Sequence, residues 1–212
     1  MLFSVAGGIP ASAQKNSVPN YQLASKEVNE RVEALLRKMT LDEKIGQLAI
    51  FSAGFATGPR NPNLKYGQLV EHGHVGALVN VVGAEATNRY QHTAVEKARL
   101  HIPLLFGLDV IHGHRTIFSI PLAIAASWDP KAAETVARTG AEEARADGID
   151  WVFSPMVDIA RDPRWGRIVE SNGEDPYLGS VMTRAWVRSP GPRSRSFTSA
   201  IPWPVWSSQC AN

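Results

Sequence analysis

The hydrophobic positions of this chain change period several times, which predicts an alternation of helices and strands. Near the start, hydrophobic residues recur three or four positions apart, as on one face of a helix (Val28, Val32, Leu35, Leu36 and Met39). Three later runs are hydrophobic at nearly every position and rich in β-branched residues, as strands buried on both faces are. They are residues 75–82, 103–110 and 151–157, and residues 45–51 carry the chain into an earlier strand.

Short polar signals mark where several helices begin. Thr40-Leu41-Asp42-Glu43 is a capping box, in which the threonine and glutamate side chains satisfy free backbone N–H groups at the start of a helix. Asp129-Pro130 and Asp175-Pro176 each place an N-cap residue before a proline suited to the first helical position. Helices are therefore predicted over residues 63–72, 84–100, 130–147 and 177–188.

The alternation of strands with helices predicts an α/β fold with a mainly parallel sheet. Asn80, Asp109 and Asp158 follow the ends of the predicted strands, where α/β folds gather their chemistry. The glycine pairs of the chain lack the spacing, and the following Lys-Ser/Thr, of a phosphate-binding loop. The sequence therefore favours a (β/α)8 barrel over a dinucleotide-binding sheet.

The two ends differ in composition from the rest of the chain. Residues 1–14 contain a short apolar stretch followed by Ala11-Ser12-Ala13, which is typical of a signal-peptide cleavage site, although a basic n-region is missing. Residues 189–212 hold six serines and four prolines but no Asp or Glu, which indicates a reading-frame change or a misjoined end after about Arg188. We expect a periplasmic or secreted protein with three regions: a leader and linker (1–24), one domain (25–188) and an irregular tail (189–212).

Charge and composition exclude several classes of partner. The chain has 22 basic and 20 acidic residues, and two of the arginines lie in the tail, so the remaining 20 basic residues balance the 20 acidic ones. A neutral body has no electrostatic attraction to nucleic acid or to an acidic membrane surface. No apolar run reaches the roughly 18 residues of a membrane-spanning helix. The single cysteine, Cys210, excludes an internal disulfide framework.

The first segment that could carry chemistry is GLDVIHGHR (residues 107–115), where a carboxylate leaves a strand. Asp109 could accept hydrogen bonds from sugar hydroxyls, and a charged acceptor makes such bonds about twice as strong as a neutral one. It could equally cap the next loop. His112 and His114 have the spacing of a metal-ligand pair, but a site needs three or four ligands. All six histidines precede residue 115, so no later strand adds one, and we expect no metal.

The second segment, residues 158–176, combines three arginines and several acids with a tryptophan beyond a strand end. Arginines that fork onto carboxylates would hold an ordered loop, and an arginine left unpaired would point its donors into a cleft. Trp165 offers a flat apolar face that suits a sugar ring or a packing contact, and we favour packing.

The strings GLDVIHGHRT and SPMVDIARDPRWGRIVESNGEDPYL, with KMTLDEKIGQL before them, resemble the N-terminal barrel of family 3 glycoside hydrolases. The resemblance is to the bacterial periplasmic β-glucosidase type, covers about residues 25–188 and keeps the three motifs in the family's order. It implies a partial (β/α)8 barrel, roughly the first half, with the irregular tail after it.

The same resemblance implies a retaining β-glucosidase, which removes terminal β-D-glucosyl residues through a covalent glycosyl-enzyme and uses no cofactor. It assigns substrate binding to Asp109 and Arg167, which would hold hydroxyls of the glycone. Arg161 is a further candidate for the site, with a structural role favoured. In the family, the nucleophile is an aspartate on a late barrel strand, and the acid/base is usually a glutamate of the following domain.

This chain departs from the family's pattern at the catalytic residues. No lysine follows Lys131 and no histidine follows His114, so the Lys-His pair of a middle strand is missing, as are the strings that carry the nucleophile and the acid/base. We expect a truncated barrel that holds part of the glycone site, is inactive alone, and self-associates through open strand edges. Three alternatives stay open: a metal-dependent barrel hydrolase using His112 and His114, a non-catalytic sugar-binding fragment, and Asp109 with Asp158 as an improvised catalytic pair.

Overall fold

The structure is a computed structural model that describes residues 25–54, 61 and 63–188. The described residues form two units, 25–39 and 40–188, each compact in itself. The predicted leader and the predicted Pro/Ser-rich tail lie outside the described residues.

The first unit contains one helix, α1 (Lys26–Lys38). The side chain of Ser25 accepts a hydrogen bond from the backbone N–H of Val28 at 3.3 Å and caps the helix start. Arg37 and Lys38 lie in the last turn, where positive charge is favourable next to the negative end of the helix dipole. The helix predicted from the spacing of the hydrophobic residues is confirmed.

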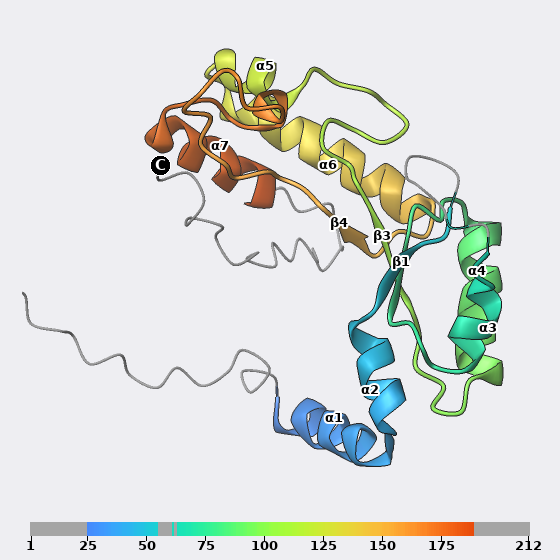
Figure 1. The fold of residues 1–212 in the computed structure, drawn as a ribbon. Coiled ribbons are helices and arrows are strands. Elements are labelled where there is room, and N and C mark those ends of the chain that lie inside the picture. Colours follow the sequence, from blue (N-terminus) through green and yellow to red (C-terminus); the bar gives the residue numbers. More distant parts are fainter. Residues whose placement is uncertain (1–24, 55–60, 62, 189–212) are drawn as a thin grey trace, which may run out of the picture. The chain divides into compact units, whose positions relative to one another are not determined.

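The second unit is built on a parallel sheet whose strands are hydrogen-bonded in chain order (Figure 1). The strands are β1 (Ile50–Ser52), β2 (Ala77–Val79), β3 (Leu105–Leu108) and β4 (Trp151–Val152). Because crossovers between parallel strands are right-handed, this order places the connecting helices on one face of the sheet, as in a (β/α)8 barrel. The predicted α/β class with a parallel sheet is confirmed, and the described part of the chain supplies four strands of it.

The helices of this unit alternate with the strands, as the sequence predicts. They are α2 (Leu41–Leu48), α3 (Tyr66–Glu71), α4 (Ala84–His92) with a π-helical continuation (Thr93–Lys97), α5 (Pro121–Ala126), α6 (Pro130–Ala146) and α7 (Pro176–Arg188). The capping box of α2 forms in both directions, with Glu43 N–H donating to Thr40 Oγ1 and Thr40 N–H donating to Glu43 Oε2. Asp129 and Asp175 accept backbone N–H groups of α6 and α7, as expected.

The strands are shorter than their hydrophobic runs, and one helix was missed. Residues 45–48 belong to α2 and not to a strand, because the helix that the capping box starts continues to Leu48. The run 151–157 is paired only at its beginning, where Phe153 N–H still donates to the carbonyl of Leu108. A hydrophobic run reports burial, whereas a strand also needs a hydrogen-bonding neighbour. Helix α5 was not predicted, because no side chain caps its start at Ile120.

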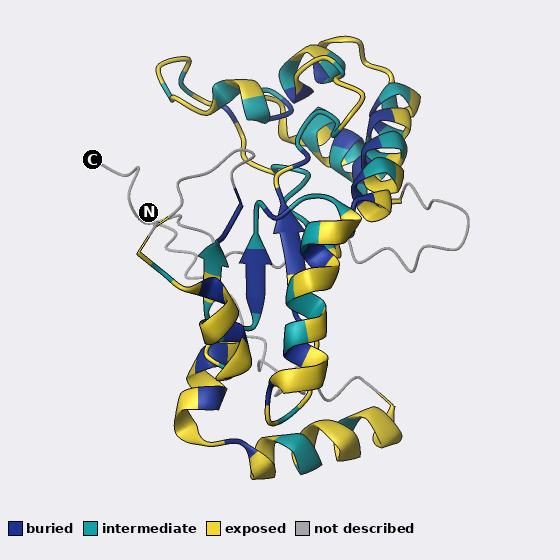
Figure 2. Ribbon diagram, turned by 90° about the vertical axis from the view of Figure 1, so that its right-hand side faces the viewer, coloured by how far each residue is buried: buried dark blue, intermediate teal, exposed yellow. Residues whose placement is uncertain are grey.

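Buried side chains form two clusters that share helix α6 (Figure 2). The first surrounds the sheet, with Leu78 and Phe106 nearly inaccessible, and includes Ala144 near the end of α6. The second joins α5, α6 and α7 through Ala133, Val136, Met182 and Trp186, with Ala125 beside them. Helix α6 therefore connects the sheet to the segments that follow the third and fourth strands.

Candidate functional site

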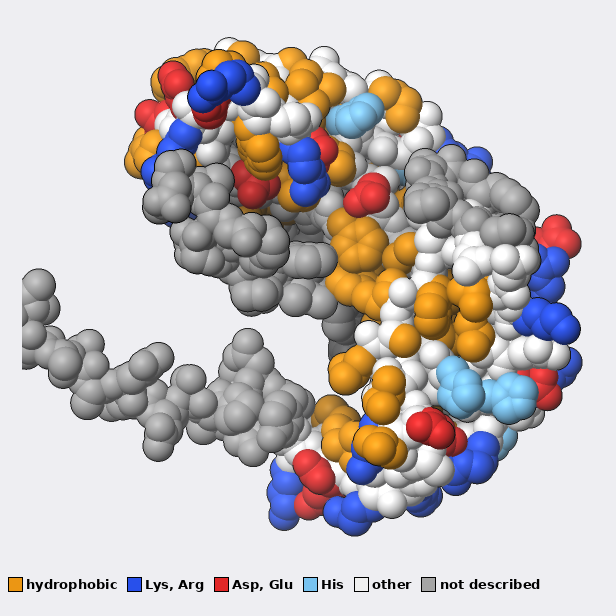
Figure 3. Space-filling view, viewed as in Figure 1, with side chains coloured by type: hydrophobic (Ala, Val, Ile, Leu, Met, Phe, Trp, Pro, Cys, Tyr) orange, Lys and Arg blue, Asp and Glu red, His pale blue; other side chains and the backbone are white. Residues whose placement is uncertain are grey.

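Asp109 follows β3 directly, at the C-terminal edge of the sheet where the sequence places it. Its surroundings disfavour the charged form: partial burial and the nearby charge of Glu170 raise the pKa of the carboxyl, while Arg167 acts in the opposite direction. Figure 3 shows acidic and basic side chains close together on the same side as the hydrophobic area over the strands. The Asp109 carboxylate makes no hydrogen bond to another described residue and is therefore available to accept from a ligand.

Arg167 is held by a fork to Glu170. Its Nε donates to both carboxylate oxygens at 3.1 and 3.0 Å, and Nη2 donates to Oε2 at 2.5 Å. Nη2 also approaches the sulfur of Met156 at 3.8 Å. The hydrogen bonds to Glu170 raise the pKa of Arg167, and the charges of Glu170, Asp158 and Asp109 add to this rise, while burial acts in the opposite direction. Arg167 is thus ion-paired with Glu170, and the charges of Asp158 and Asp109 act on it without a hydrogen bond.

Local turns in the loop after β4 bring Arg167 and Glu170 together. A short 3-10 helix over Ile168–Glu170, capped by Arg167, places Arg167 and Glu170 three positions apart on the same side of one turn. Ser171 is fully buried, and its hydroxyl donates to the carbonyl of Ile168. The N–H of Ala160 donates to the carbonyl of Gly173 at 3.0 Å, which closes the loop.

The three arginines of this loop have different partners. Arg164 forks onto Asp162 two positions before it, with Nε 3.0 Å from Oδ1. Arg161 is exposed and forms no hydrogen bond or ion pair with another residue of the described part of the chain. The structure therefore brings Arg167, and neither of the other two, into electrostatic contact with Asp109.

The two histidines considered as metal ligands have different surroundings. His114 Nε2 lies 2.6 Å from Asp147 Oδ2, so this ring is bonded to a helix behind the loop. His112 Nδ1 is buried and has no hydrogen-bond partner among the described residues. Within those residues, no group of three or more His, Cys, Asp or Glu side chains converges as a metal site would.

Glu170 is a site residue that the sequence reasoning did not single out. Its carboxylate accepts hydrogen bonds from the Arg167 guanidinium, and its charge raises the pKa of Asp109. The signal was present as the Arg-x-x-Glu spacing at 167–170, which places two side chains on one side of a helical turn. Trp165 is half-buried, and its carbonyl accepts from Ile168 N–H, so its backbone is part of the same turn.

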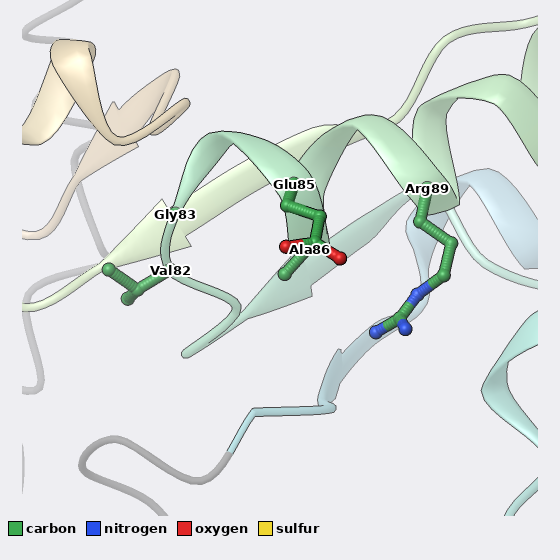
Figure 4. Close-up of a pocket in the computed structure, with 5 residues that line it drawn as sticks. All are labelled: Val82, Gly83, Glu85, Ala86 and Arg89. Atoms are coloured by element: carbon green, nitrogen blue, oxygen red, sulfur yellow. The ribbon is translucent and has the colours of Figure 1, made fainter.

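A separate pocket lies beside the start of α4 (Figure 4). Val82, Gly83, Glu85, Ala86 and Arg89 line it, and the guanidinium of Arg89 lies 5.7 Å from the ring centre of Tyr90. Neither Asp109 nor the arginines of the loop after β4 line this pocket.

No helix among the described residues is both long and apolar enough to cross a lipid bilayer.

Comparison with known proteins places the chain in a family. The sequence model described as "Glycosyl hydrolase family 3 N terminal domain" matches residues 40–191, which is most of the chain. The chain belongs to glycoside hydrolase family 3. The match includes the sheet, the segment after β3 and the arginine-rich loop after β4.

Individual relatives agree with this assignment. A periplasmic beta-glucosidase from Salmonella typhimurium is 43% identical over 180 residues, covering 85% of this chain and 23% of the relative. A putative beta-xylosidase from Formosa agariphila is 35% identical over 178 residues, 77% of this chain and 24% of that protein. The chain thus spans about a quarter of the length of these curated relatives.

Solved structures of relatives have the same arrangement of elements. A beta-glucosidase from Listeria innocua, in complex with glucose, superimposes with a TM-score of 0.66 at 41% identity, covering 76% of this chain and 23% of that one. The same enzyme in complex with isofagomine is similar at 42% identity and a TM-score of 0.66, covering 76% and 22%. The partial barrel expected from the sequence is therefore the fold of a glycosidase N-terminal domain.

Proposed function

We propose that this chain supplies part of the glycone-binding site of a retaining β-glucosidase that hydrolyses terminal β-D-glucosyl residues. The observation that supports this most directly is the cluster of Asp109, Arg167, Glu170 and Asp158 at the C-terminal edge of β3 and β4. Family membership and the similarity to beta-glucosidases support the same substrate class.

The cluster has the chemistry that sugar hydroxyls require. A hydroxyl both donates and accepts, so a neighbouring carboxylate and guanidinium can bind two adjacent hydroxyls of one ring. Asp109 supplies the acceptor. Arg167 uses Nε and Nη2 on Glu170, while its Nη1 makes no hydrogen bond to another described residue and retains its two donors. Arg161, exposed in the same loop, is a further candidate for contact with the sugar.

We assign no catalytic residue within this chain. Retention needs two carboxylates about 5 Å apart, one as nucleophile and one as acid/base. Glu170 is ion-paired with Arg167, and burial and the Glu170 charge raise the pKa of Asp109, which suits binding better than nucleophilic attack. The 212-residue polypeptide is therefore expected to bind a monosaccharide without hydrolysing a glycoside.

Calorimetric titration of glucose into the purified chain tests the binding site. Asp109→Ala and Arg167→Gln should each abolish the heat of binding, because each removes a charged partner of a hydroxyl. Arg164→Gln is the matched control, since this arginine lies in the same loop but is paired with Asp162. Binding by the parent chain that survives both site substitutions would remove the basis of the proposal.

Hydrolysis assays separate the remaining alternatives. The chain should release no product from an aryl β-glucoside. Turnover that disappears in Asp109→Ala or in Asp158→Ala would instead favour these two carboxylates as an improvised pair. Turnover that depends on added zinc and on His112 would favour the metal-dependent hydrolase.

Two further expectations concern the location and association of the protein. The signal-like residues 1–14 predict export, and a relative is called a periplasmic beta-glucosidase. Fusing residues 1–24 to a reporter enzyme that is active only outside the cytoplasm checks this. The outer edges of β1 and β4 in the described sheet favour self-association, which sedimentation at rising concentration measures.

A further inference from the structure

Two carboxylates near the end of α6 bind the tip of the loop that follows Asp109. Glu143 Oε2 accepts from the backbone N–H groups of Arg115 and Thr116, both at 2.8 Å, and Oε1 accepts from the Thr116 hydroxyl at 2.6 Å. Asp147 Oδ2 accepts from His114 Nε2 at 2.6 Å and from Arg115 Nε at 3.0 Å, while Oδ1 accepts from Arg115 Nη2. Because a carboxylate only accepts, the proton of the His114 ring lies on Nε2.

Asp147 is buried in an unfavourable place for a negative charge. It is the C-cap residue of α6, next to the negative end of the helix dipole, and its side chain is 7% exposed. The charge is retained because Arg115 and His114 bond to it, which lowers the pKa of the Asp147 carboxyl to about 2. Among the described residues, the side-chain partners that compensate the Asp147 charge all come from the loop after β3.

Asp147 also binds the loop after β2, through its backbone. The backbone carbonyl of Asp147 accepts from the N–H of Gly83 at 3.1 Å, and Gly83 is the N-cap of α4 in a positive-φ conformation (φ 96°). The segments after β2 and after β3 are therefore both attached to the end of α6.

Helix α6 also contacts the chain immediately after Asp109. Val110 is 5% exposed and belongs to the same buried cluster as Ala144. A Cβ atom placed on Gly140 would lie 3.0 Å from Val110 Cγ1 and 3.6 Å from the Cα of Gly113. The helix thus approaches Val110 closely and binds the loop again at residues 114–116, four to six positions further on.

From this geometry we infer that Asp147, together with Glu143, is a positioning residue for the glycone site: it fixes the loop after β3 and thereby the direction of the Asp109 carboxylate. Neither residue touches the proposed sugar site. Their effect passes through Arg115, Thr116 and the short turn 113–117, which an isolated bridge between Gly113 and Ile117 closes. The inference rests on the proposed function only in the identity of the ligand.

The test compares the full chain with Asp147→Asn, which keeps the shape of the side chain and removes its charge. Glu142→Gln is the control, because Glu142 lies on the same helix, is exposed and makes no hydrogen bond or ion pair with another described residue. The readout is the 13C resonance of the Asp109 carboxyl, followed through an acid titration. A role confined to overall stability does not change that titration in the folded state.

We expect Asp147→Asn to move the Asp109 titration toward the ordinary range of an aspartate, as the carboxyl changes its position relative to Glu170 and Arg167. Glu142→Gln should leave the titration unchanged. An Asp109 titration that is identical in the parent chain and in Asp147→Asn overturns the inference. If Asp147→Asn does not fold, Arg115→Gln replaces it with the same two outcomes, because the Arg115 side chain is 68% exposed and Asp147 keeps its bond to His114.

Glucose binding gives a second readout that separates the two proposals. Where the parent chain binds glucose, Asp147→Asn should weaken binding about tenfold, since a small misplacement of a binding group carries a large loss. Unchanged affinity in that variant contradicts the positioning role. Where the parent chain binds no glucose, the proposed function fails, and the Asp109 titration still decides whether Asp147 positions this carboxylate.

Discussion

The two loops that carry the candidate site are held in opposite ways. The loop after β3 is bound to a distant helix, through hydrogen bonds between residues 27 to 33 positions apart. The loop after β4 is held mainly by itself: Arg164 pairs with Asp162 two positions away, and Arg167 with Glu170 three positions away. The anchor of the first loop, Asp147, is 7% exposed, whereas Arg164 is 88% exposed.

This difference separates interactions that stabilise the fold from interactions that shape a surface. An exposed ion pair contributes little because water and salt screen it and because two long side chains lose freedom. Removing the hydrogen-bond donors of a buried carboxylate reduces the free energy of unfolding strongly, because its charge then has no partner. We therefore expect changes at the anchored tip of the loop after β3 to reduce stability, and changes in the loop after β4 to leave stability nearly unchanged.

The largest effect is expected from a matched pair of glycine substitutions. Gly113 in the loop after β3 has φ +113°, and a Cβ there would lie 1.9 Å from the carbonyl oxygen of Thr116. Gly113→Ala should lower the free energy of unfolding by about 2–3 kcal/mol, from backbone strain and the clash. Gly166 in the loop after β4 has no atom within 4 Å of such a Cβ. Gly166→Ala should change stability by less than about 0.5 kcal/mol.

Urea unfolding of both variants measures this contrast. Equal losses of stability would mean that the two loops are not held differently, and the comparison would fail.

A smaller effect is expected from acid. The pKa of Asp147 is lowered from 3.8 to about 2, chiefly by its bonds to Arg115 and His114. A carboxyl with a lowered pKa stabilises the fold while it is charged, so its contribution is complete above about pH 4 and is lost as the pH falls toward 2. Between pH 5 and pH 3 the parent chain should therefore lose stability, and Asp147→Asn should lose less.

The unfolding midpoint in urea at the two pH values gives the measurement. Glu43, whose pKa is also lowered to about 2 by Arg99 and its capping bonds, titrates in the same window and is present in both proteins. Only the difference between parent and variant reports Asp147. An identical loss in both would assign the acid sensitivity elsewhere.

A still smaller change, of opposite sign, is expected at Asp109. Burial and the charge of Glu170 raise the pKa of this carboxyl, so its charged form destabilises the fold at neutral pH. Asp109→Asn should raise the thermal midpoint slightly at pH 7, and the gain should shrink as the pH falls and the parent carboxyl takes up a proton. A fall in the midpoint at pH 7 would show instead that the charge stabilises the loop. Calorimetric scans at pH 7 and pH 4 distinguish these outcomes.

The smallest effect is expected at Arg164. Its fork to Asp162 is short in sequence and open to solvent, and the arginine side chain is 88% exposed. Arg164→Gln should leave the urea midpoint unchanged within error, because an exposed pair of this kind contributes little. A clear loss of stability would place the loop after β4 in the same class as the loop after β3.

The sequence alone determined the class of fold and the two segments that carry the site. Hydrophobic runs, the capping box at Thr40 and the two Asp-Pro pairs are local signals, and the elements they predict are present. Asp109 could be placed at a strand end for the same reason, because a strand and the residue after it are neighbours in the chain. The Arg-x-x-Glu spacing at residues 167–170 is also a local signal for the ion pair of Arg167 with Glu170.

Only the tertiary structure decided where the strands stop and what holds the loop after β3. Strand pairing depends on a neighbour that is many residues away, so the run 151–157 gave no sign that its pairing ends soon after Val152. The attachment of His114 and Arg115 to Asp147 joins residues 33 and 32 positions apart. No periodicity records such a contact, because it arises when α6 packs against the sheet and brings a buried charge to donors from another segment.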